Sequence, residues 1–344
     1  MSLNKINILF RTSGGVAPNK ELGFGHVYRC INLAKKISNN EIFFEIEDYG
    51  QVKKILIKNN FRNIFNLKKN IKLNAEIKET IKIVKNNSID IVIIDKYKIN
   101  KKILKEISRI VKTVYIADLK KRDFPVDLVI NGFVGYDNQI SYNKSKTKCL
   151  LGPKYQILDN QFEVQKTKKK KYDLLITFGG YDENNIIELF LECWEKIQKK
   201  IKILIILGPG TKRTQQIKKM LKKYPKEITI MNQTSKMFEN IAETRFGLCA
   251  SGLTTYEFAR MKIPFAIICQ NKHQLITAKE WEKRKIAKNL GIINKNTSKK
   301  INKYLTSIIE NKIKLTINKT YSINSESKTL VNEIKKLVNV KSIN

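Results

Sequence analysis

Short apolar runs alternate along most of the chain with stretches whose apolar residues recur at helical spacing. Residues 6–10 form the first run, and the stretch 27–37 then repeats apolar residues every three or four positions. Strands separated by helices form parallel sheets joined by right-handed crossovers, so this alternation predicts an α/β protein.

The predicted strands fall into two groups along the chain. The first group comprises residues 6–10, 42–46, 89–95, 111–117 and 128–131, and the second comprises 174–178, 201–207, 228–231, 246–250 and 265–269. A basic, polar stretch from Lys166 to Lys171 separates them. A chain of 344 residues also exceeds what one hydrophobic core usually serves. We therefore predict two Rossmann-like domains with parallel sheets, residues 1–165 and 166–344, with the C-terminal helices as candidates to pack back.

Ligands of open parallel sheets bind beyond the carboxyl ends of the strands. We therefore expect the two domains to face one cleft, with the functional residues at strand ends. Asp95 and Asp118 each follow a predicted strand. Each carboxylate is expected either to face the cleft or to bind the backbone of a loop.

The formal charge of +36 would by itself suggest a nucleic acid or an anionic membrane as partner. However, only nine of the 67 basic residues are Arg, and the abundance of Lys, Ile and Asn is typical of translation from an AT-rich genome. No stripe of Arg and aromatic residues of the kind that reads bases is present in the sequence. We expect a solvated basic surface that attracts anionic substrates such as sugar nucleotides, and no nucleic-acid partner.

The sequence favours a cytoplasmic protein. No apolar run approaches the roughly 20 residues that span a bilayer, and the N-terminus has no signal-peptide pattern. The five cysteines show no CxxC spacing and lie in apolar or helical contexts. They are therefore interpreted as buried thiols, without a disulfide framework or a zinc site.

A glycine loop, Gly23-Phe24-Gly25-His26, lies between the first strand and the first helix. Gly23 and Gly25 would permit positive φ angles and close approach of a ligand to the backbone. His26 then falls at the helix N-terminus, where free N–H groups favour anions and lower the pKa of a histidine. His26 is the candidate catalytic residue, as a neutral proton acceptor; the alternative is a histidine that only caps the helix.

Three motifs of the second half also follow strands. Gly179-Gly180 is either a phosphate-binding turn or an ordinary connector. In the second motif, Ser251-Gly252 precedes a helix that Thr254 or Thr255 opens, with Glu257 one turn further on. Hydroxyls and helix N–H groups there suit a diphosphate, and Glu257 suits the ribose hydroxyls, although a capping box is the structural alternative. The third is a polar cluster that contains His273-Gln274.

Together these motifs resemble the UDP-sugar hydrolase of pseudaminic acid biosynthesis and the related spore-coat polysaccharide biosynthesis proteins. The resemblance covers roughly residues 5–290. The matching segments, in chain order, are 9–11, 23–26 with Arg29, 94–97, 117–118, 127–131, 151–155, 177–180, 250–257 and 263–264.

The resemblance implies a GT-B fold like that of the lipid II-forming N-acetylglucosaminyltransferase. It implies a UDP site in the C-terminal domain, a sugar site on the N-terminal domain, and hydrolysis of a UDP-linked diacetamido-trideoxy-altrose to UDP and the free sugar. No metal and no cofactor are implied, and we expect a monomer. His26 would activate or position the water. The expected substrate contacts are Arg11, Gly25, Arg29, Asp95, Tyr97, Gly179, Gly180, Ser251, Gly252, Thr254, Thr255, Glu257, His273 and Gln274.

Three departures from the family pattern concern the sugar. The loop between Arg11 and Gly23, residues 12–22, is longer than usual and borders the sugar site of the family. Lys96 stands where the family commonly has His, between Asp95 and Tyr97. His273-Gln274 replaces an Asn-Gln pair. We therefore expect this chain to differ from the family in its sugar substrate more than in its fold.

Two alternative functions remain open. A GT-B glycosyltransferase would pass the sugar to an acceptor hydroxyl, and a lipid-linked acceptor would favour an amphipathic, aromatic-rich face that the sequence does not show. A non-catalytic protein could instead bind nucleotide sugars. The glycine loop with its histidine favours catalysis over binding alone.

Overall fold

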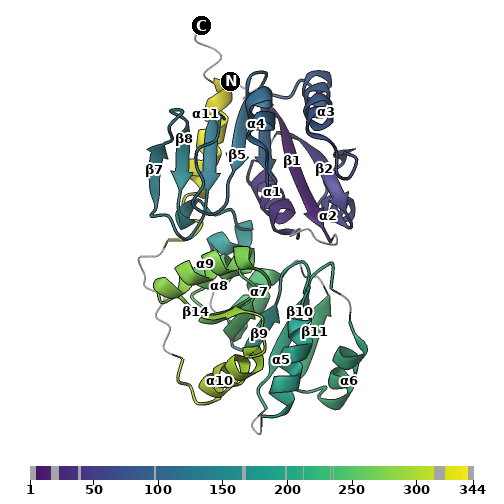
Figure 1. Cartoon of the computed structure of the whole chain (residues 1–344), viewed down its shortest axis with the longest axis vertical. Coiled ribbons are helices and arrows are strands. Elements are labelled where there is room, and N and C mark those ends of the chain that lie inside the picture. The colour runs from purple at the N-terminus through teal and green to yellow at the C-terminus, as the bar shows by residue number, and fades with distance from the viewer. Residues whose placement is uncertain are drawn as a thin grey trace. The chain divides into compact units, whose positions relative to one another are not determined.

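The computed structural model describes residues 5–16, 23–37, 40–96, 98–164, 168–197, 200–211, 213–232, 234, 236–313 and 322–339. The chain divides into two compact units (Figure 1): unit 1 comprises Met1–Asn160 and Asn324–Asn344, and unit 2 comprises Gln161–Ile323. Each unit is a parallel sheet interleaved with helices, as predicted from the alternating pattern.

The division falls at residue 160, five residues before the predicted boundary at 165. Helix α11 (Ser327–Asn339), one of the C-terminal helices named as candidates to pack back, belongs to unit 1. Leu330 and Ile334 lie one turn apart on this helix and are buried in the core of unit 1. Lys148 also forms an ion pair of 2.5 Å with Glu333 of α11. The apolar stripe of the last helix therefore completes the first core rather than the second.

Unit 1 contains an eight-stranded sheet in the order β3-β2-β1-β4-β5-β6-β8-β7. All neighbouring strands are parallel except the edge pair β7–β8. The strands are β1 (Asn7–Gly15), β2 (Glu41–Tyr49), β3 (Asn63–Asn66), β4 (Ile91–Asp95), β5 (Lys112–Ile116), β6 (Leu128–Asn131), β7 (Gln139–Tyr142) and β8 (Lys148–Leu151). The first half thus continues beyond residues 128–131, which the sequence pattern indicated as its last strand.

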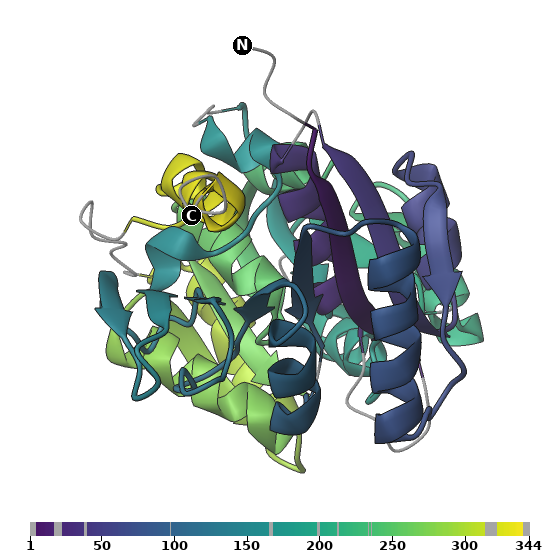
Figure 2. The same ribbon diagram turned by 90° about the horizontal axis from the view of Figure 1, so that it is seen from above.

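Helices cover both faces of this sheet. The helices of unit 1, besides α11, are α1 (Gly25–Lys36), α2 (Val52–Lys58), α3 (Leu73–Asn86), α4 (Lys101–Ser108) and the 3-10 turns η1 (Pro153–Tyr155) and η2 (Asn160–Glu163), the last of which runs on into unit 2. One face, here called the α1 face, packs against α1, α2 and α11, and the other, the α3 face, packs against α3 and α4. In the view from above, α3 and α4, in blue, lie together beside the purple strand β1 (Figure 2).

The alternation of side chains decides which polar residues reach which face. Ile91 and Ile93 of β4 lie in the core of the α1 face, so Asp95 continues that row. Leu9 of β1 and Phe43 of β2 lie in the core of the α3 face, so residues two and four positions further along these strands face α3.

Unit 2 contains a six-stranded, wholly parallel sheet in the order β11-β10-β9-β12-β13-β14. Its strands are β9 (Tyr172–Thr177), β10 (Ile203–Leu207), β11 (Ile228–Asn232), β12 (Thr244–Cys249), β13 (Phe265–Cys269) and β14 (Ala287–Ile292). Its helices are α5 (Ile186–Glu195), α6 (Gln215–Lys223), α7 (Met237–Ala242), α8 (Leu253–Arg260), α9 (Lys272–Lys283) and α10 (Thr297–Ile309). Trp194 of α5 and Tyr304 of α10 are fully buried in the core on one face of this sheet.

The predicted fold class, two parallel α/β units, is therefore confirmed, with strand β7 as the antiparallel exception. Within the part of the chain that the structure describes, none of the helices is long and apolar enough to cross a membrane.

Candidate active site

His26 is the second residue of helix α1 and lies against the carboxyl end of β4. Its Nδ1 atom is 2.6 Å from Oδ1 of Asp95, the last residue of that strand. The Asp95 side chain has no exposed surface, whereas the His26 side chain is 17% exposed. The predicted position of His26 at a helix N-terminus is confirmed, and the fold adds a buried carboxylate beside the imidazole.

Arg29, one turn further along α1, holds two carboxylates. Its Nε and Nη2 atoms donate to Asp95 Oδ2 and Oδ1 at 2.7 and 2.6 Å, which is a bidentate pair. Its Nη1 atom donates to Asp118 Oδ1 at 2.7 Å, just beyond the end of β5. Asp95 and Asp118 continue the rows of the α1 face on neighbouring strands, so one arginine on α1 can bind both.

The contact between His26 and Asp95 determines which ring nitrogen carries the proton in the neutral imidazole. A carboxylate oxygen only accepts hydrogen bonds, so the Nδ1–H of His26 donates to Asp95. In the neutral ring, Nε2 then carries a lone pair and can accept a proton. This is the arrangement by which a carboxylate orients a histidine general base.

The pKa of His26 is raised, whereas the sequence predicted that the helix N-terminus would lower it. Burial alone would lower this pKa, but the charge of Asp95, its hydrogen bond and the charge of Asp118 together outweigh burial. The prediction failed because both carboxylates come from distant parts of the chain. His26 therefore keeps its second proton to a higher pH than an ordinary histidine.

His26, Asp95 and Asp118 offer donor atoms within 4.8 Å of one another, a spacing that suits a cation. Arg29 already binds both carboxylates through Nε, Nη1 and Nη2. A metal ion at this point would have to displace the guanidinium group. Metal independence of the reaction stays a prediction.

The glycines before His26 could permit a positive φ or close approach of a ligand to the backbone. Neither Gly23 nor Gly25 has a positive φ, so the first of these possibilities is not used. A Cβ added to either glycine would meet no atom within 4 Å among the described residues. Among the residues of unit 1 that the structure describes, none therefore requires glycine at position 25, which is exposed and leaves open space at its Cβ position.

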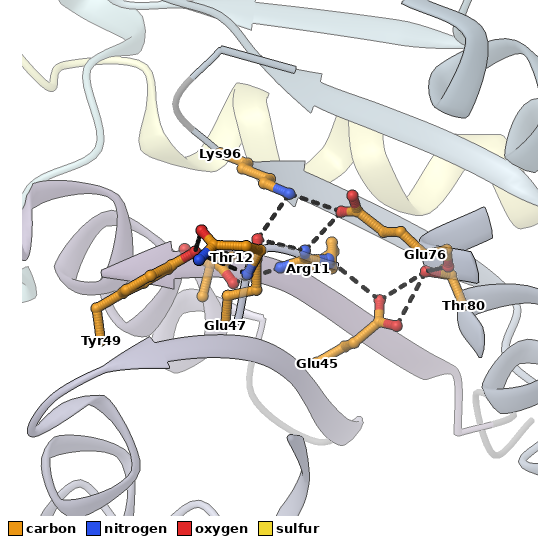
Figure 3. A network of polar contacts seen from close by, with 9 residues as sticks. Arg11, Thr12, Glu45, Glu47, Tyr49, Glu76, Thr80 and Lys96 are labelled. Carbon is orange, nitrogen blue, oxygen red and sulfur yellow. Dashed lines mark hydrogen bonds and ion pairs between the residues drawn. The ribbon is translucent and has the colours of Figure 1, made fainter. Parts of the chain in front are cut away.

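Arg11 does not fit the predicted contact with substrate. Its side chain is fully buried and lies on the α3 face, where it forms ion pairs with Glu47 at 3.1 Å and Glu76 at 2.5 Å (Figure 3). This prediction is wrong because Arg11 follows the row of Leu9, on the face of β1 opposite His26.

Two other predictions about unit 1 concern residues outside the described part of the chain. Tyr97 lies outside the described residues, as do residues 17–22 of the long loop. The first part of that loop is strand, because β1 continues to Gly15. The Gly15 N–H donates to the carbonyl of Gly23 at 3.1 Å, which ties the strand end to the glycine loop.

In unit 2, Gly252 is the N-cap residue of helix α8. A Cβ at Gly252 would meet no atom within 4 Å, and the buried Oγ of Ser251 has no hydrogen-bond partner among the described residues. Thr254 and Glu257, both half-buried, lie in the first turns of the same helix. These features suit an anion, because the first N–H groups of a helix lack partners within it.

Thr255 is a correction to the predicted site. Its side chain is fully buried, and its hydroxyl donates to the carbonyl of Gly252 at 2.7 Å and accepts from Trp281 Nε1 at 3.0 Å. Since both hydrogen-bonding functions are satisfied inside unit 2, Thr255 holds the turn rather than a substrate.

The Gly179-Gly180 turn is a connector that packs on the loop after β10, and phosphate binding by this turn stays a prediction. The carbonyl of Gly180 accepts from the Gly210 N–H at 2.8 Å, and a Cβ at Gly208 would lie 1.9 Å from the Gly179 carbonyl oxygen. The turn therefore packs closely on the neighbouring loop. Gly179 itself is exposed, has a φ of +71° and leaves open space at its Cβ position.

His273 and Gln274 lie in the first turn of helix α9. His273 is half-buried, and the side-chain oxygen of Gln274 accepts from the Gln270 N–H at 2.9 Å. Gln270 in turn donates to the carbonyl of Tyr181 at 3.1 Å. Gln274 thus supports the loop after β13, which is connected to the Gly179-Gly180 turn.

The structure therefore groups His26, Arg29 and Asp95 of the predicted site residues and adds Asp118 to them. Asp118 is absent from the predicted substrate contacts, although its position at a strand end was the signal. The predicted residues of unit 2 gather at the carboxyl ends of β9, β12 and β13.

Comparisons with known proteins agree with this fold. Residues 174–335 match the glycosyltransferase family 28 C-terminal domain. The structure of MurG from Acinetobacter baumannii aligns with a TM-score of 0.58 over 96% of this chain and 99% of that one, at 15% sequence identity. The fold is therefore GT-B-like.

Three curated relatives are similar in sequence. MJ1062 of Methanocaldococcus jannaschii, an uncharacterized protein, is 29% identical over 78% of this chain and 57% of its own length. The spore coat polysaccharide biosynthesis protein SpsG of Bacillus subtilis is 25% identical over 48% of this chain and 50% of its own length. The chain thus spans about half the length of these two relatives.

The third relative is the UDP-2,4-diacetamido-2,4,6-trideoxy-β-L-altropyranose hydrolase of Campylobacter jejuni, 26% identical over 79% of this chain and 95% of that one. The resemblance inferred from the motifs is confirmed at this level: the chain is similar to a UDP-sugar hydrolase, to SpsG and to glycosyltransferases.

Proposed function

We propose that the protein hydrolyses a UDP-linked, acylated amino sugar to UDP and the free sugar, as a step of surface polysaccharide or nonulosonic acid formation. The pairing of His26 with Asp95 carries this proposal, because it orients an imidazole whose Nε2 can take a proton. Similarity to the Campylobacter jejuni hydrolase supports the choice of reaction and substrate class.

The proposed reaction is a displacement at the anomeric carbon. A water oxygen bonds to that carbon while the bond to the diphosphate oxygen breaks, and Nε2 of His26 accepts a proton from the water. Asp95 and Asp118 stabilise the imidazolium that forms, and Arg29 fixes both carboxylates. The electron pair of the broken bond leaves with UDP.

In unit 2, we assign the diphosphate to the N-terminus of helix α8. The N–H groups there, together with the buried Oγ of Ser251 that has no partner among the described residues, would stabilise charge developing on the leaving group. The open space at Gly252 admits a ligand close to the backbone. Glu257 is the candidate for the ribose hydroxyls.

The proposal is tested by incubating the purified protein, without any acceptor, with a panel of UDP-linked mono- and diacetamido sugars. We expect stoichiometric release of UDP and free sugar from at least one diacetamido compound. Release of neither product from any member of the panel would contradict hydrolysis.

A glycosyltransferase is the second candidate, because residues 174–335 match a glycosyltransferase family domain. It shares the site but transfers the sugar to an acceptor hydroxyl, which would donate its proton to His26 in place of water. UDP release that appears only after addition of an acceptor, with the sugar recovered on that acceptor, would favour this candidate over hydrolysis.

Gly25→Ala is expected to lower kcat/KM by roughly tenfold or more without loss of stability. Alanine favours helix by up to about 1 kcal/mol relative to glycine, and its Cβ meets no described atom of the protein. The methyl group would instead occupy space assigned to the substrate, and small displacements of bound groups cost large factors in rate. Thermal unfolding and steady-state kinetics measure the two effects.

Gly291→Ala is the matched control for this variant. Gly291 lies in unit 2 with a φ of +86°, so alanine there is expected to cost about 1–2 kcal/mol of stability and to leave turnover unchanged. If Gly25→Ala instead lost stability and kept its turnover, the assignment of the open space to substrate would be wrong.

A further inference from the structure

A second cluster of charges, drawn in Figure 3, lies on the α3 side of the sheet. His26 belongs to helix α1, which packs on the other face. Two cations, Arg11 and Lys96, meet three carboxylates, Glu45, Glu47 and Glu76. These residues come from β1, β2, α3 and the position that follows β4. The mechanism proposed above uses none of them.

Most of this cluster is closed to a ligand. The side chains of Arg11 and Glu45 have no exposed surface, and the Thr80 hydroxyl donates to Glu45 at 2.9 Å. Buried charges of this kind are tolerated only when each is paired and hydrogen-bonded. The inner part of the cluster is therefore interpreted as a link between β1, β2 and helix α3.

Lys96 differs from the other members. Its side chain is 16% exposed, more than that of any carboxylate it contacts. Its Nζ atom lies 2.7 Å from Glu47 and 2.8 Å from Glu76, and these two contacts use two of the three N–H groups of the ammonium. The third N–H has no partner among the described residues.

Lys96 also lies at the end of the sheet where a ligand is expected. It directly follows Asp95, the residue that ends β4 and binds His26. Consecutive residues of an extended chain point to opposite faces, so Asp95 turns to α1 while Lys96 turns to Glu76 of α3. Both groups lie at the carboxyl ends of the strands, where open parallel sheets bind ligands.

We propose that Lys96 determines sugar specificity by donating its third N–H to an uncharged oxygen of the sugar. This oxygen would belong to the carbonyl of an acylamino group or to a hydroxyl. The inference rests on the proposed function, since it assumes that a UDP-sugar binds at this edge.

The charges around Lys96 explain why the acceptor is uncharged. Three carboxylates face two cations, so the cluster offers no surplus positive charge to an anionic sugar substituent. Burial raises the pKa of Glu45 to about 7. Near neutrality, the net charge of the cluster therefore lies between −1, with Glu45 ionised, and zero, with Glu45 protonated. A uronate would be repelled by Glu47 and Glu76, which lie within 2.8 Å of the Lys96 nitrogen.

The test measures binding rather than turnover. Calorimetry on the full chain would give Kd values for UDP, UDP-glucose, UDP-N-acetylglucosamine, UDP-glucuronate and UDP-2,4-diacetamido-2,4,6-trideoxy-β-L-altropyranose. We expect the wild-type protein to bind at least one neutral sugar nucleotide more tightly than UDP, and UDP-glucuronate no more tightly than UDP. Comparison of the glucose and acetylglucosamine compounds tells whether the acceptor is a hydroxyl or an acyl carbonyl.

Lys96→Met is expected to lower the preference for that sugar nucleotide over UDP by roughly 10- to 100-fold, the range for a hydrogen bond from a charged donor. The Kd for UDP alone should not change. Lys112→Met is the matched control, because Lys112 forms a 2.9 Å ion pair with Asp127 at the opposite, amino end of β5. It is expected to leave all the ratios unchanged.

Lys96→Arg keeps the charge that pairs with Glu47 and Glu76, and it tests the idea if Lys96→Met does not fold. The N–H groups of arginine lie at other positions than those of the lysine ammonium. We therefore expect a several-fold change in the ratio of the Kd values for UDP and the sugar nucleotide, with a normal thermal midpoint. If the role of Lys96 were purely structural, its replacement would weaken the binding of UDP and of UDP-sugars alike.

Unchanged ratios in the Lys96 variants that fold, or a wild-type protein that prefers no sugar nucleotide over UDP, would overturn the proposal. Absence of UDP release would instead contradict hydrolysis and leave the binding ratios to decide the role of Lys96.

Discussion

His26→Ala is expected to lower kcat/KM for the UDP-sugar by roughly two to four orders of magnitude, the usual contribution of a positioned general base. The reason is geometric: Nδ1 donates to Asp95 at 2.6 Å, so in the proposed reaction Nε2 is the atom that takes the proton of the attacking water. The measurement is the initial rate of UDP release at substrate concentrations below KM. Affinity for UDP should stay within a factor of a few, because the diphosphate is assigned to helix α8.

A control separates this effect from a loss of fold. Lys35→Ala changes an exposed residue of the same helix and should preserve both turnover and thermal midpoint. Near-normal turnover of His26→Ala with the true substrate would remove His26 from the role of base.

Asp95→Asn is expected to reduce kcat/KM by a similar factor, roughly two to four orders of magnitude. In the general template of a carboxylate-oriented histidine, replacement of the carboxylate by an amide costs about 10⁴ in rate. In this chain, the amide would also leave Arg29 without the bidentate partner that it binds at 2.6 and 2.7 Å. Breaking such a buried pair costs about 3–5 kcal/mol, so thermal unfolding must be measured alongside kinetics.

The pH profile gives a second readout for the same variant. As a base, His26 must be neutral, so kcat/KM falls as the pH falls through the pKa of His26. The carboxylates raise this pKa above its ordinary value of 6.5, so the acid limb of the wild-type protein should lie above pH 6.5. Loss of the Asp95 charge lowers the pKa, and the acid limb of Asp95→Asn should move to lower pH.

The same linkage predicts a change in stability with pH. Because the pKa of His26 is raised in the folded state, its charged form stabilises the fold below the unfolded pKa of 6.5, and this contribution is lost as the pH rises through the folded pKa. Asp118→Asn offers a milder comparison for the pKa of His26, since the Asp118 side chain is 38% exposed and its hydrogen bonds from Arg29 measure 2.7 and 3.3 Å.

An acid limb that does not move in Asp95→Asn would mean that another group controls the pH profile.

Much of the fold could be predicted because it depends on local pattern. The apolar runs at 91–95 and 265–269 are strands, and His26 lies at the start of a helix. Asp95 was correctly placed at a strand end, since the apolar run before it stops there. These features need only the spacing of residues that are neighbours along the chain.

The C-terminal helix shows where local pattern stops being sufficient. The apolar stripe of α11 indicates a buried helix, but it does not say which of two cores buries it. Leu330 and Ile334 belong to the core of unit 1, whose first segment ends at Asn160, far earlier in the chain. That choice depends on the complementarity of surfaces that are far apart in the sequence.

The sequence by itself therefore determined the two parallel α/β units, the helix that begins before His26, and the strand ends that carry Asp95 and Asp118. Only the tertiary structure decided that Arg11 faces α3 while Asp95 faces His26, and that the pKa of His26 is raised. The physical reason is that a side chain's face depends on the register of its strand. A pKa depends on charges in space, and here the decisive carboxylate is 69 residues away along the chain.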